Sequence, residues 1–525
     1  MAKALSNTQI VRAAMVVVGG FLASGILGLV RTAAFSATFG ASESLDAFYA
    51  AQNIPEILFV LVAGGALGSS FIPVFARFLN GDDQAGAWRL ASAVMSCVAV
   101  LATVLALIIG VFAPVLVPVV VDFSPPMQAL TLDLTRIMLV TVVIFSISGL
   151  LMGILNAQQV FTLPALALAS NNLGQIFGAL VIVPLLPAGS KIYGLALGAI
   201  LGAVLHLIVQ IPGLSRVGSR LVFLPDPRIP GVTEVLSLML PRVLGLAVVQ
   251  INFLVNLSLA SGMTPGSYSA LKIAWTLMFF ALGVIAQSVG TAVFPSLSAF
   301  AATGDMDGFR DRLAGAMRGV LFLSFPATVG LILLGQVGIS LLLQYGEWTP
   351  ESTAATAWAL GFFAVGIAGH SLLEVLSRAF YALSDTRTPV LIGVISMGVN
   401  IALSVILIRF IGDPTSLSRG SFAGLALANS LATLLEGVAL WWILRRRIGG
   451  LKDRFVIGGA IRAFAAAVGM GVVVWIIINV LGGYGGLITA VIGGLVGVIV
   501  FFVLAFIFGI DEARTMPRLL LRRGR

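Results

Sequence analysis

The sequence predicts an all-α polytopic membrane protein, and three observations support that fold class. The mean hydropathy is +1.10, and 59% of the 525 residues are hydrophobic while 10% are charged. Charged residues make up about a quarter of an ordinary soluble domain. Apolar segments long enough to cross a bilayer recur along the whole chain, and the 59 glycines suit membrane helices, which pack through small residues.

We expect about fourteen transmembrane helices, since roughly 20 apolar residues are needed to cross the hydrocarbon core. The apolar segments lie near 10–38, 48–76, 89–119, 128–155, 162–186, 191–214, 233–261, 267–301, 313–343, 355–381, 389–410, 421–444, 460–482 and 485–509. The first run is too long for a signal peptide and lacks a small-residue cleavage site, so we interpret it as a retained span. Prolines interrupt several spans, at Pro55, Pro164, Pro241, Pro295 and Pro326. Such bends favour a transporter over a passive anchor, because helices bend around cavities.

Lysine and arginine gather in nearly every second loop, and cytoplasmic loops are the ones that collect them. The densest group follows the twelfth span and consists of Arg445, Arg446, Arg447, Lys452 and Arg454. Both termini are therefore predicted to be cytoplasmic. This topology accounts for the net charge of +9 without a nucleic-acid partner. The basic tail Arg514 to Arg525 is expected to lie on anionic headgroups.

An internal repeat divides the chain. Phe71-Ile72-Pro73, Gly81-Asp82 and Arg89-Leu90 after span two resemble Phe294-Pro295, Gly304-Asp305 and Arg312-Leu313 after span eight. Parallel repeats of this kind pack as two lobes with a site between them. We expect an N-lobe over 1–225, a C-lobe over 226–455, and two additional helices with a basic tail over 456–525. The two six-helix lobes would be pseudo-symmetric around a central cavity.

No catalytic constellation is visible, so the sequence does not indicate an enzyme. The two histidines, His206 and His370, lie in distant spans, and structural or pore-lining roles are favoured over metal binding. Cys97, the only cysteine, is most simply a packing residue. No Gly-rich nucleotide loop with Lys-Ser or Lys-Thr is present. We therefore expect no metal and no cofactor, and coupling to the membrane potential or to a monovalent cation.

Three cations interrupt apolar sequence: Arg31 in span one, Arg242 in span seven and Lys272 in span eight. A cation facing lipid costs several kcal/mol. One interpretation is snorkelling, because Arg31 lies about 30 Å along its helix from Ile10 and would reach the outer headgroups. The other is a shared cationic cavity, which is favoured because both lobes supply a cation at similar depth, with Arg242 nearer the inner side. Such a cavity would hold an anionic substrate.

Acidic and amide groups in the spans leave alternatives open. Asp46 is interpreted as a cap of a helix beginning at Ala47, with a gating or ion-coupling role as the alternative. Glu374 and Glu436 lie in apolar spans together with several asparagines. Hydrogen bonding between helices is the more common explanation for such groups, with a cation site as the alternative.

An ordered series of motifs runs through most of the first twelve predicted spans. The motifs are Ser24-x-x-Leu27-Gly28-x-x-Arg31, Phe39-Gly40, Asp46-Ala47-Phe48, Ile54-Pro55, Gly65-Ala66, Phe71-Ile72-Pro73, Phe294-Pro295-Ser296-Leu297-Ser298, Gln344-Tyr345-Gly346, Arg378-Ala379-Phe380-Tyr381-Ala382, Asp385-Thr386 and Thr388-Pro389. With these motifs the chain resembles the MurJ (MviN) family of lipid II flippases, within the group of multidrug and polysaccharide exporters.

The resemblance implies a flippase that carries the undecaprenyl-pyrophosphate-linked peptidoglycan precursor, lipid II, from the inner to the outer leaflet by alternating access. It implies that Arg31 is the family's first-helix cavity arginine, and Ser24 and Asp46 also match family positions. The second-lobe arginine corresponds to Thr276, so Lys272, one turn earlier on the same face, is a stand-in. Lipid II and membrane lipids are the expected partners, with cell-wall synthesis proteins as further candidates.

The chain departs from the family pattern at several charged positions: Gly25, Phe59, Gly64 and Thr276. Arg242 would compensate in part. These departures keep open a second interpretation, export of another polyprenyl-pyrophosphate-linked glycan. A drug-cation exporter is disfavoured because its cavity would need buried acids. A non-transporting scaffold for cell-wall synthesis is disfavoured by the short loops.

Overall fold

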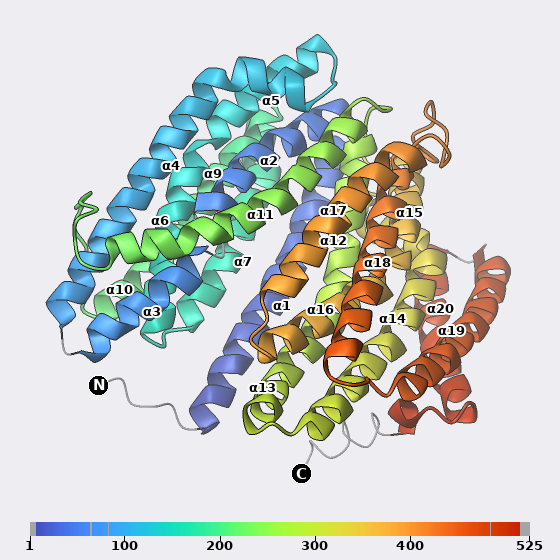
Figure 1. Ribbon diagram of the computed structural model, residues 1–525. Helices are drawn as coiled ribbons and strands as arrows, with labels where there is room; N and C mark the ends of the chain where they lie inside the picture. Colours follow the sequence, from blue (N-terminus) through green and yellow to red (C-terminus); the bar gives the residue numbers. More distant parts are fainter. Residues whose placement is uncertain (1–6, 63–65, 82, 483–484, 515–525) are drawn as a thin grey trace. The chain divides into compact units, whose positions relative to one another are not determined.

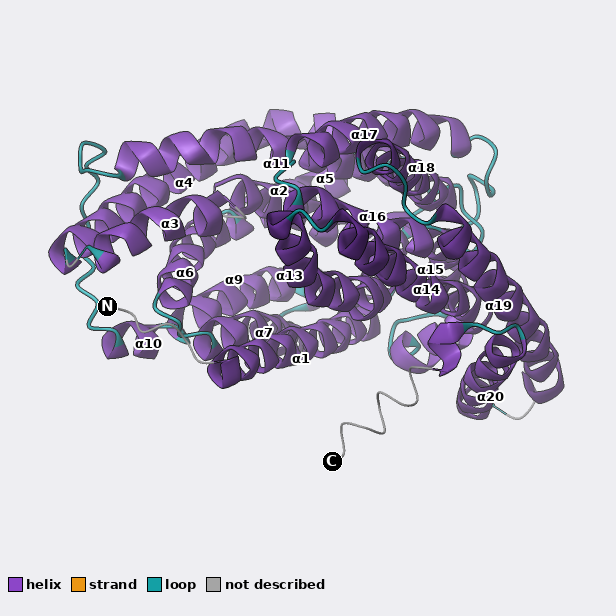
Figure 2. Ribbon diagram, turned by 60° about the horizontal axis from the view of Figure 1, so that its bottom comes forward, coloured by secondary structure: helices purple, strands orange, loops and turns teal. Residues whose placement is uncertain are grey.

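A computed structural model describes residues 7–62, 66–81, 83–482 and 485–514. The described chain is built from helices joined by short loops (Figure 2). It divides into two compact units, Met1–Gly266 and Ser267–Arg525, called unit 1 and unit 2 below. Each unit is described separately.

Unit 1 is a bundle in which α7 packs against both α1 and α9, and α2 packs against α5 and α6. Figure 1 shows α11 lying across this bundle, and α11 packs against α2, α3 and α4. The helices of unit 1 are α1 (Asn7–Phe39), α2 (Glu43–Val62), α3 (Ala66–Asn80), α4 (Gln84–Val120), α5 (Pro125–Met138), α6 (Val140–Ala157), α7 (Thr162–Phe177), the π-helix η1 (Gly178–Ile182), α8 (Val183–Leu185), the short η2 (Ala188–Ser190), α9 (Tyr193–Ile208), α10 (Ile211–Arg216) and α11 (Val232–Ser261).

Unit 2 is organised around α14, which packs against α13, α15, α16, α19 and α20. A second contact group joins α18 to α15, α16 and α17. The helices of unit 2 are α12 (Ser267–Leu282), the π-helix η3 (Gly283–Gln287), α13 (Ser288–Thr303), α14 (Met306–Leu343), α15 (Pro350–Val365), α16 (Ile367–Ala382), α17 (Arg387–Leu407), α18 (Ala423–Arg447), α19 (Asp453–Leu481) and α20 (Gly486–Ile507).

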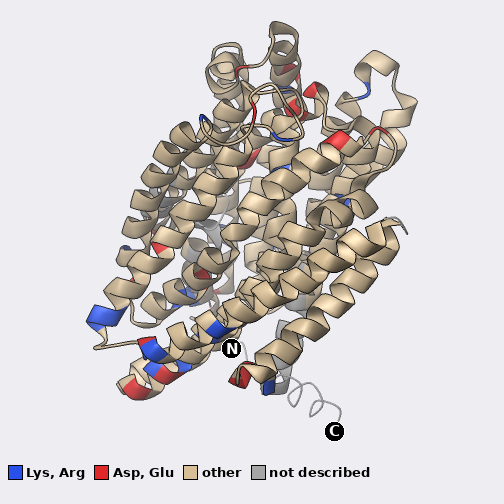
Figure 3. Ribbon diagram, turned by 90° about the vertical axis from the view of Figure 1, so that its right-hand side faces the viewer, with Lys and Arg blue, Asp and Glu red and all other residues tan. Residues whose placement is uncertain are grey.

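The predicted fold class is confirmed. Among the described residues, 12 helical segments are long and apolar enough to cross a membrane, and α15 with α16 forms one further candidate span bent by 45°. The predicted span 233–261 is a continuous helix, α11. In Figure 3 the charged residues lie mostly toward the helix ends, as expected for spans whose middle portions face hydrocarbon.

Prolines lie inside several of the helices without ending them. Pro55, Pro295 and Pro326 all lie inside helices that continue through them. The irregular turns within spans are instead two π-helical segments, Gly178–Ile182 and Gly283–Gln287. Both begin at a glycine. Neighbouring helices and local adjustments satisfy the carbonyl that each proline leaves unbonded, so the ring alone does not end a membrane helix.

The boundary between the packing units falls after α11, at Gly266, whereas the repeat suggested lobes over 1–225 and 226–455. By packing, α11 belongs with unit 1, and α19 and α20 belong with unit 2 through α14. The division by packing reports which helices are in contact, whereas the division by repeat reports which segments resemble one another in sequence. The predicted lobe boundaries therefore stay a prediction.

The two halves use the same device to start their longest helices. The Asp83 side chain accepts a hydrogen bond from Gly86 N at 2.8 Å before α4, and Asp305 accepts from Gly308 N at 2.9 Å before α14. Each carboxylate thereby satisfies one of the unbonded amides in the first turn. The sequence repeat aligned Asp82 with Asp305. Asp82 lies outside the described residues, and the capping equivalent is its neighbour Asp83.

Candidate substrate-binding site

Arg31 lies in the second half of α1, within the apolar window Leu22–Phe39. Its side chain is half-buried, and its Cζ atom lies 6.0 Å from the centre of the Phe35 ring. Among the described residues no ion pair or hydrogen bond holds the guanidinium, although Glu56 attracts it electrostatically.

An aromatic cluster fixes the helix turn that carries Arg31. Phe35 is almost fully buried and meets Phe48 edge to face at 5.5 Å and Tyr49 at 6.4 Å. Phe48 and Tyr49 lie in the second turn of α2. Aromatic pairs at these separations add to the free energy of burial. The cluster therefore sets the orientation of α1 against α2 one turn away from the guanidinium.

Ser24 is tied to α7 and lies two turns before Arg31 on α1. The Asn172 side-chain amide donates to the Ser24 carbonyl at 3.1 Å and to its Oγ at 3.2 Å. Asn172 is buried. This contact gives Ser24 a place in the α1–α7 interface. A substrate contact by Ser24 stays a prediction.

Asp46 lies in the first turn of α2 and is buried. The helix begins at Glu43, four residues before the Ala47 start that the sequence suggested, and the Ser42 hydroxyl accepts from Leu45 N at 3.3 Å. Asp46 therefore does not cap a helix that starts at Ala47. Its Oδ2 accepts from the backbone amide of Gly266 at 2.7 Å.

The Asp46 contact fixes the last residue of unit 1. Gly266 has a φ of +88°, and a Cβ atom placed on it would lie 2.4 Å from the Ala41 carbonyl oxygen. Only glycine adopts this backbone conformation so close to the Ala41 backbone without strain. The carboxylate thus holds the segment after α11 where α12 begins.

Replacing Asp46 with alanine is expected to lower the free energy of unfolding by about 1–3 kcal/mol, because a buried amide loses a charged acceptor. Thermal unfolding of the purified protein in detergent measures the change. Glu43→Ala is the matched control, since Glu43 is an exposed acid in the same first turn. Equal shifts for the two variants would mean that the general charge of the turn, and not the contact with Gly266, stabilises this region.

The other two predicted cations are Lys272 and Arg242. Lys272 is half-buried on α12, and its carbonyl accepts a hydrogen bond from Thr276 Oγ1 at 2.9 Å, consistent with the two residues lying one turn apart. Lys272 belongs to unit 2 and Arg31 to unit 1, so their joint site stays a prediction. Arg242 falls in α11, and its side chain lies outside the described residues.

The positions that depart from the family pattern have defined surroundings where they are described. Phe59 packs against Phe145 with ring centres 5.4 Å apart and joins the apolar core of unit 1. A cation at that position would have to leave this core. Gly25 is half-buried in α1, and Gly64 lies outside the described residues.

Both histidines make structural contacts. Ser148 Oγ lies 2.6 Å from His206 Nδ1, and the Gln210 amide donates to the same hydroxyl at 2.7 Å. His370 Nε2 lies 3.1 Å from Asn429 Oδ1. In the described part of the chain, no group of three or more metal-ligating side chains could hold a metal ion.

Two polar contacts were not foreseen from the sequence. Asn172 is one of the asparagines in apolar spans, and Arg378 belongs to the motif Arg378-Ala379-Phe380-Tyr381-Ala382. Arg378 pairs with Glu374 at 2.7 Å across one turn of α16 and packs against Gly290, which has no side chain to exclude it. The i,i+4 spacing of Glu374 and Arg378 was the available signal.

Comparisons with known proteins agree with this arrangement. Residues 35–502 match the family described as lipid II flippase MurJ. The chain is 30% identical over 443 residues to the lipid II flippase MurJ of Burkholderia cenocepacia, covering 83% of this chain and 84% of that protein. It is 29% identical over 506 residues to the probable lipid II flippase MurJ of Thermotoga maritima, covering 96% and 97%.

Solved structures share the fold. A lipid II flippase MurJ in an inward closed conformation superimposes with a TM-score of 0.78 at 23% identity, covering 95% of this chain and 99% of that one. An inward-facing multidrug resistance transporter of the MATE family, in the MOP superfamily, gives 0.68 at 15% identity, covering 82% and 96%. The sequence match from residue 35 to residue 502, which includes the helices that carry Asp46 and Lys272, shows that the chain belongs to the lipid II flippase MurJ family.

Proposed function

We propose that this protein translocates lipid II, the polyprenyl-pyrophosphate-linked peptidoglycan precursor, from the inner to the outer leaflet of the bacterial cytoplasmic membrane. The observation that carries the proposal is Arg31, a half-buried cation inside an apolar span of a chain that belongs to the MurJ family. A pyrophosphate provides the anionic oxygens that an arginine binds through paired hydrogen bonds.

The roles of the residues follow from their chemistry. Arg31 would bind the pyrophosphate, with Lys272 adding a point charge and Arg242 a second guanidinium. Ser24 would donate a hydroxyl near the head group. Asp46 would act through its hydrogen bond with Gly266, which precedes α12. Movement of this segment away from Asp46 would break that hydrogen bond.

Transport would proceed by alternating access. The head group enters between the lobes while the polyprenyl tail stays in lipid, and rocking of the lobes changes the open side. The membrane potential would assist outward movement of the anionic head, since each charge that crosses 100 mV contributes about 2.3 kcal/mol. The gradient of a monovalent cation is the alternative source of free energy for transport.

A second candidate is transport of another polyprenyl-pyrophosphate-linked glycan. Phe59 favours it, because this position contributes an aromatic ring to the core where the resemblance to the family implies an arginine. A cavity with fewer cations makes fewer contacts with a sugar-linked pyrophosphate. The pyrophosphate is common to both substrates, so the Arg31 contact serves either.

Rescue of a strain depleted of its lipid II flippase distinguishes the two substrates. We expect the wild-type protein to restore growth and the appearance of lipid II in the outer leaflet, measured by its cleavage by an externally added enzyme. An empty vector serves as the control. Growth failure despite membrane expression comparable to the native flippase would contradict lipid II as the substrate.

A further inference from the structure

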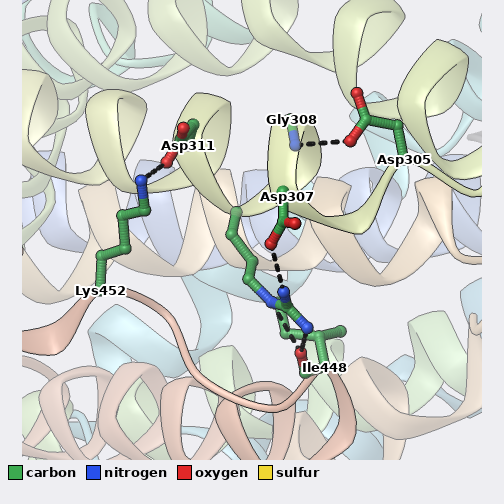
Figure 4. A network of polar contacts seen from close by, with 7 residues as sticks. Asp305, Asp307, Gly308, Asp311, Ile448 and Lys452 are labelled. Carbon is green, nitrogen blue, oxygen red and sulfur yellow. Dashed lines mark hydrogen bonds and ion pairs between the residues drawn. The ribbon is translucent and has the colours of Figure 1, made fainter.

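Ion pairs join the start of α14 and the loops that follow α16 and α18, at one end of unit 2. Several carboxylates at this end take part in these ion pairs. Figure 4 shows Asp307 pairing with Arg310 at 2.7 Å and Asp311 pairing with Lys452. The Arg310 guanidinium also donates to the Ile448 carbonyl, at 2.8 Å from Nε. These contacts fasten the start of α14 to the loop between α18 and α19.

Two more carboxylates at this end are engaged in the same way. Asp453 pairs with Arg445 at 2.9 Å, and Asp385 pairs with Arg447. Hydrogen bonds from the Thr388 side chain and backbone, with a further contribution from Arg447, lower the pKa of Asp385 to about 2. Asp385 is therefore ionised at neutral pH, where it pairs with Arg447.

Arg446 lies between these two paired arginines and has no carboxylate partner within the described residues. Its Cζ atom lies 3.8 Å from the centre of the Trp442 ring, one turn earlier on α18. Both side chains are exposed, the tryptophan to 51%. Stacking holds the guanidinium plane in place while its N–H edges stay available for an anion.

An apolar stripe continues from this pair along α18. Leu435 and Val438 are 56% and 61% exposed, and their spacing of three and four residues places them on one helix face with Trp442 and Arg446. In a membrane protein such a face contacts lipid chains. Tryptophan is enriched where the chains meet the headgroups, so the stripe runs from the hydrocarbon to the interface.

We propose that this face of α18 is a binding site for an anionic glycerophospholipid, with the phosphate on Arg446 and an acyl chain along Trp442, Val438 and Leu435. The loop charges predict that this end is cytoplasmic, and the cytoplasmic leaflet carries the anionic lipids. An anionic headgroup complements the positive charge of Arg446. The nearby carboxylates of Asp453 and Asp385 pair with Arg445 and Arg447 and so do not neutralise Arg446.

Native mass spectrometry of the purified full-length protein, titrated with phosphatidylglycerol or phosphatidylcholine of identical chains, tests the site. We expect phosphatidylglycerol to bind about fivefold more tightly, and Arg446→Gln to abolish that preference, as loss of a charge-assisted hydrogen bond requires. Trp442→Leu keeps an apolar side chain and is expected to reduce the preference about twofold.

Arg216→Gln is the matched control, because Arg216 is also exposed at the end of a helix, α10, and stacks on no aromatic ring in the described part of the chain. It should change the preference by less than about twofold. Equal losses for Arg216→Gln and Arg446→Gln would overturn the site in favour of diffuse attraction. So would equal binding of the two phospholipids, or an Arg446-dependent competition by inorganic phosphate as strong as that by phosphatidylglycerol.

Discussion

Replacing Arg31 with alanine is expected to abolish rescue of a strain depleted of its lipid II flippase. The substitution removes the donors that we assign to the pyrophosphate, and a charge-assisted pair of hydrogen bonds in a partly buried site contributes about 1.5–3 kcal/mol, or roughly 10- to 150-fold in affinity. Arg31→Lys keeps the charge but loses the planar fork, so partial rescue is expected.

The measurement compares growth and outer-leaflet lipid II at equal membrane expression. Arg216→Ala removes a cation from an exposed loop end and should rescue fully. The thermal unfolding of Arg31→Ala should stay close to that of the wild type, because the guanidinium lies 6.0 Å from the Phe35 ring centre and, among the described residues, Glu56 attracts it without a direct ion pair. Full rescue by both Arg31→Ala and Lys272→Ala would exclude the cationic site while leaving transport intact.

The helices and the first-helix cation could be predicted because both depend on local sequence. Hydropathy alone requires a helix wherever an apolar run crosses hydrocarbon, since no other open structure satisfies the backbone there. The cost of a cation in lipid likewise identified Arg31 from its immediate neighbours. Neither inference needed knowledge of which helices pack together.

The contacts that define the site depend on residues far apart in sequence. Asp46 and Gly266 are separated by 220 positions, so nothing near Asp46 indicates that its acceptor role is toward the end of α11. The local pattern suggested a cap at Ala47, but Ser42 supplies an earlier hydroxyl and the helix starts at Glu43.

Replacing Gly198 with valine is expected to cause a large loss of stability in unit 1. Gly174 in α7 and Gly178 at the start of η1 face three glycines of α9, which are Gly194, Gly198 and Gly202. Along each segment these glycines follow one another at intervals of four residues. A Cβ atom on Gly198 would lie 2.7 Å from the Gly178 Cα, and one on Gly178 would lie 2.5 Å from the Gly198 Cα. Small residues at this spacing let membrane helices approach closely.

The obstruction in Gly198→Val is backbone, so α7 and α9 must separate along their contact. Overpacking of this kind costs about 1–3 kcal/mol and more where no side chain can move aside. We expect a lower unfolding temperature and a smaller monodisperse fraction in detergent. Gly315→Val is the control, because Gly315 is exposed on α14 and a Cβ atom there meets nothing within 4 Å. An unchanged unfolding temperature for Gly198→Val would show that α7 and α9 do not depend on this close approach, and that the glycines serve the adjoining π-helical turn instead.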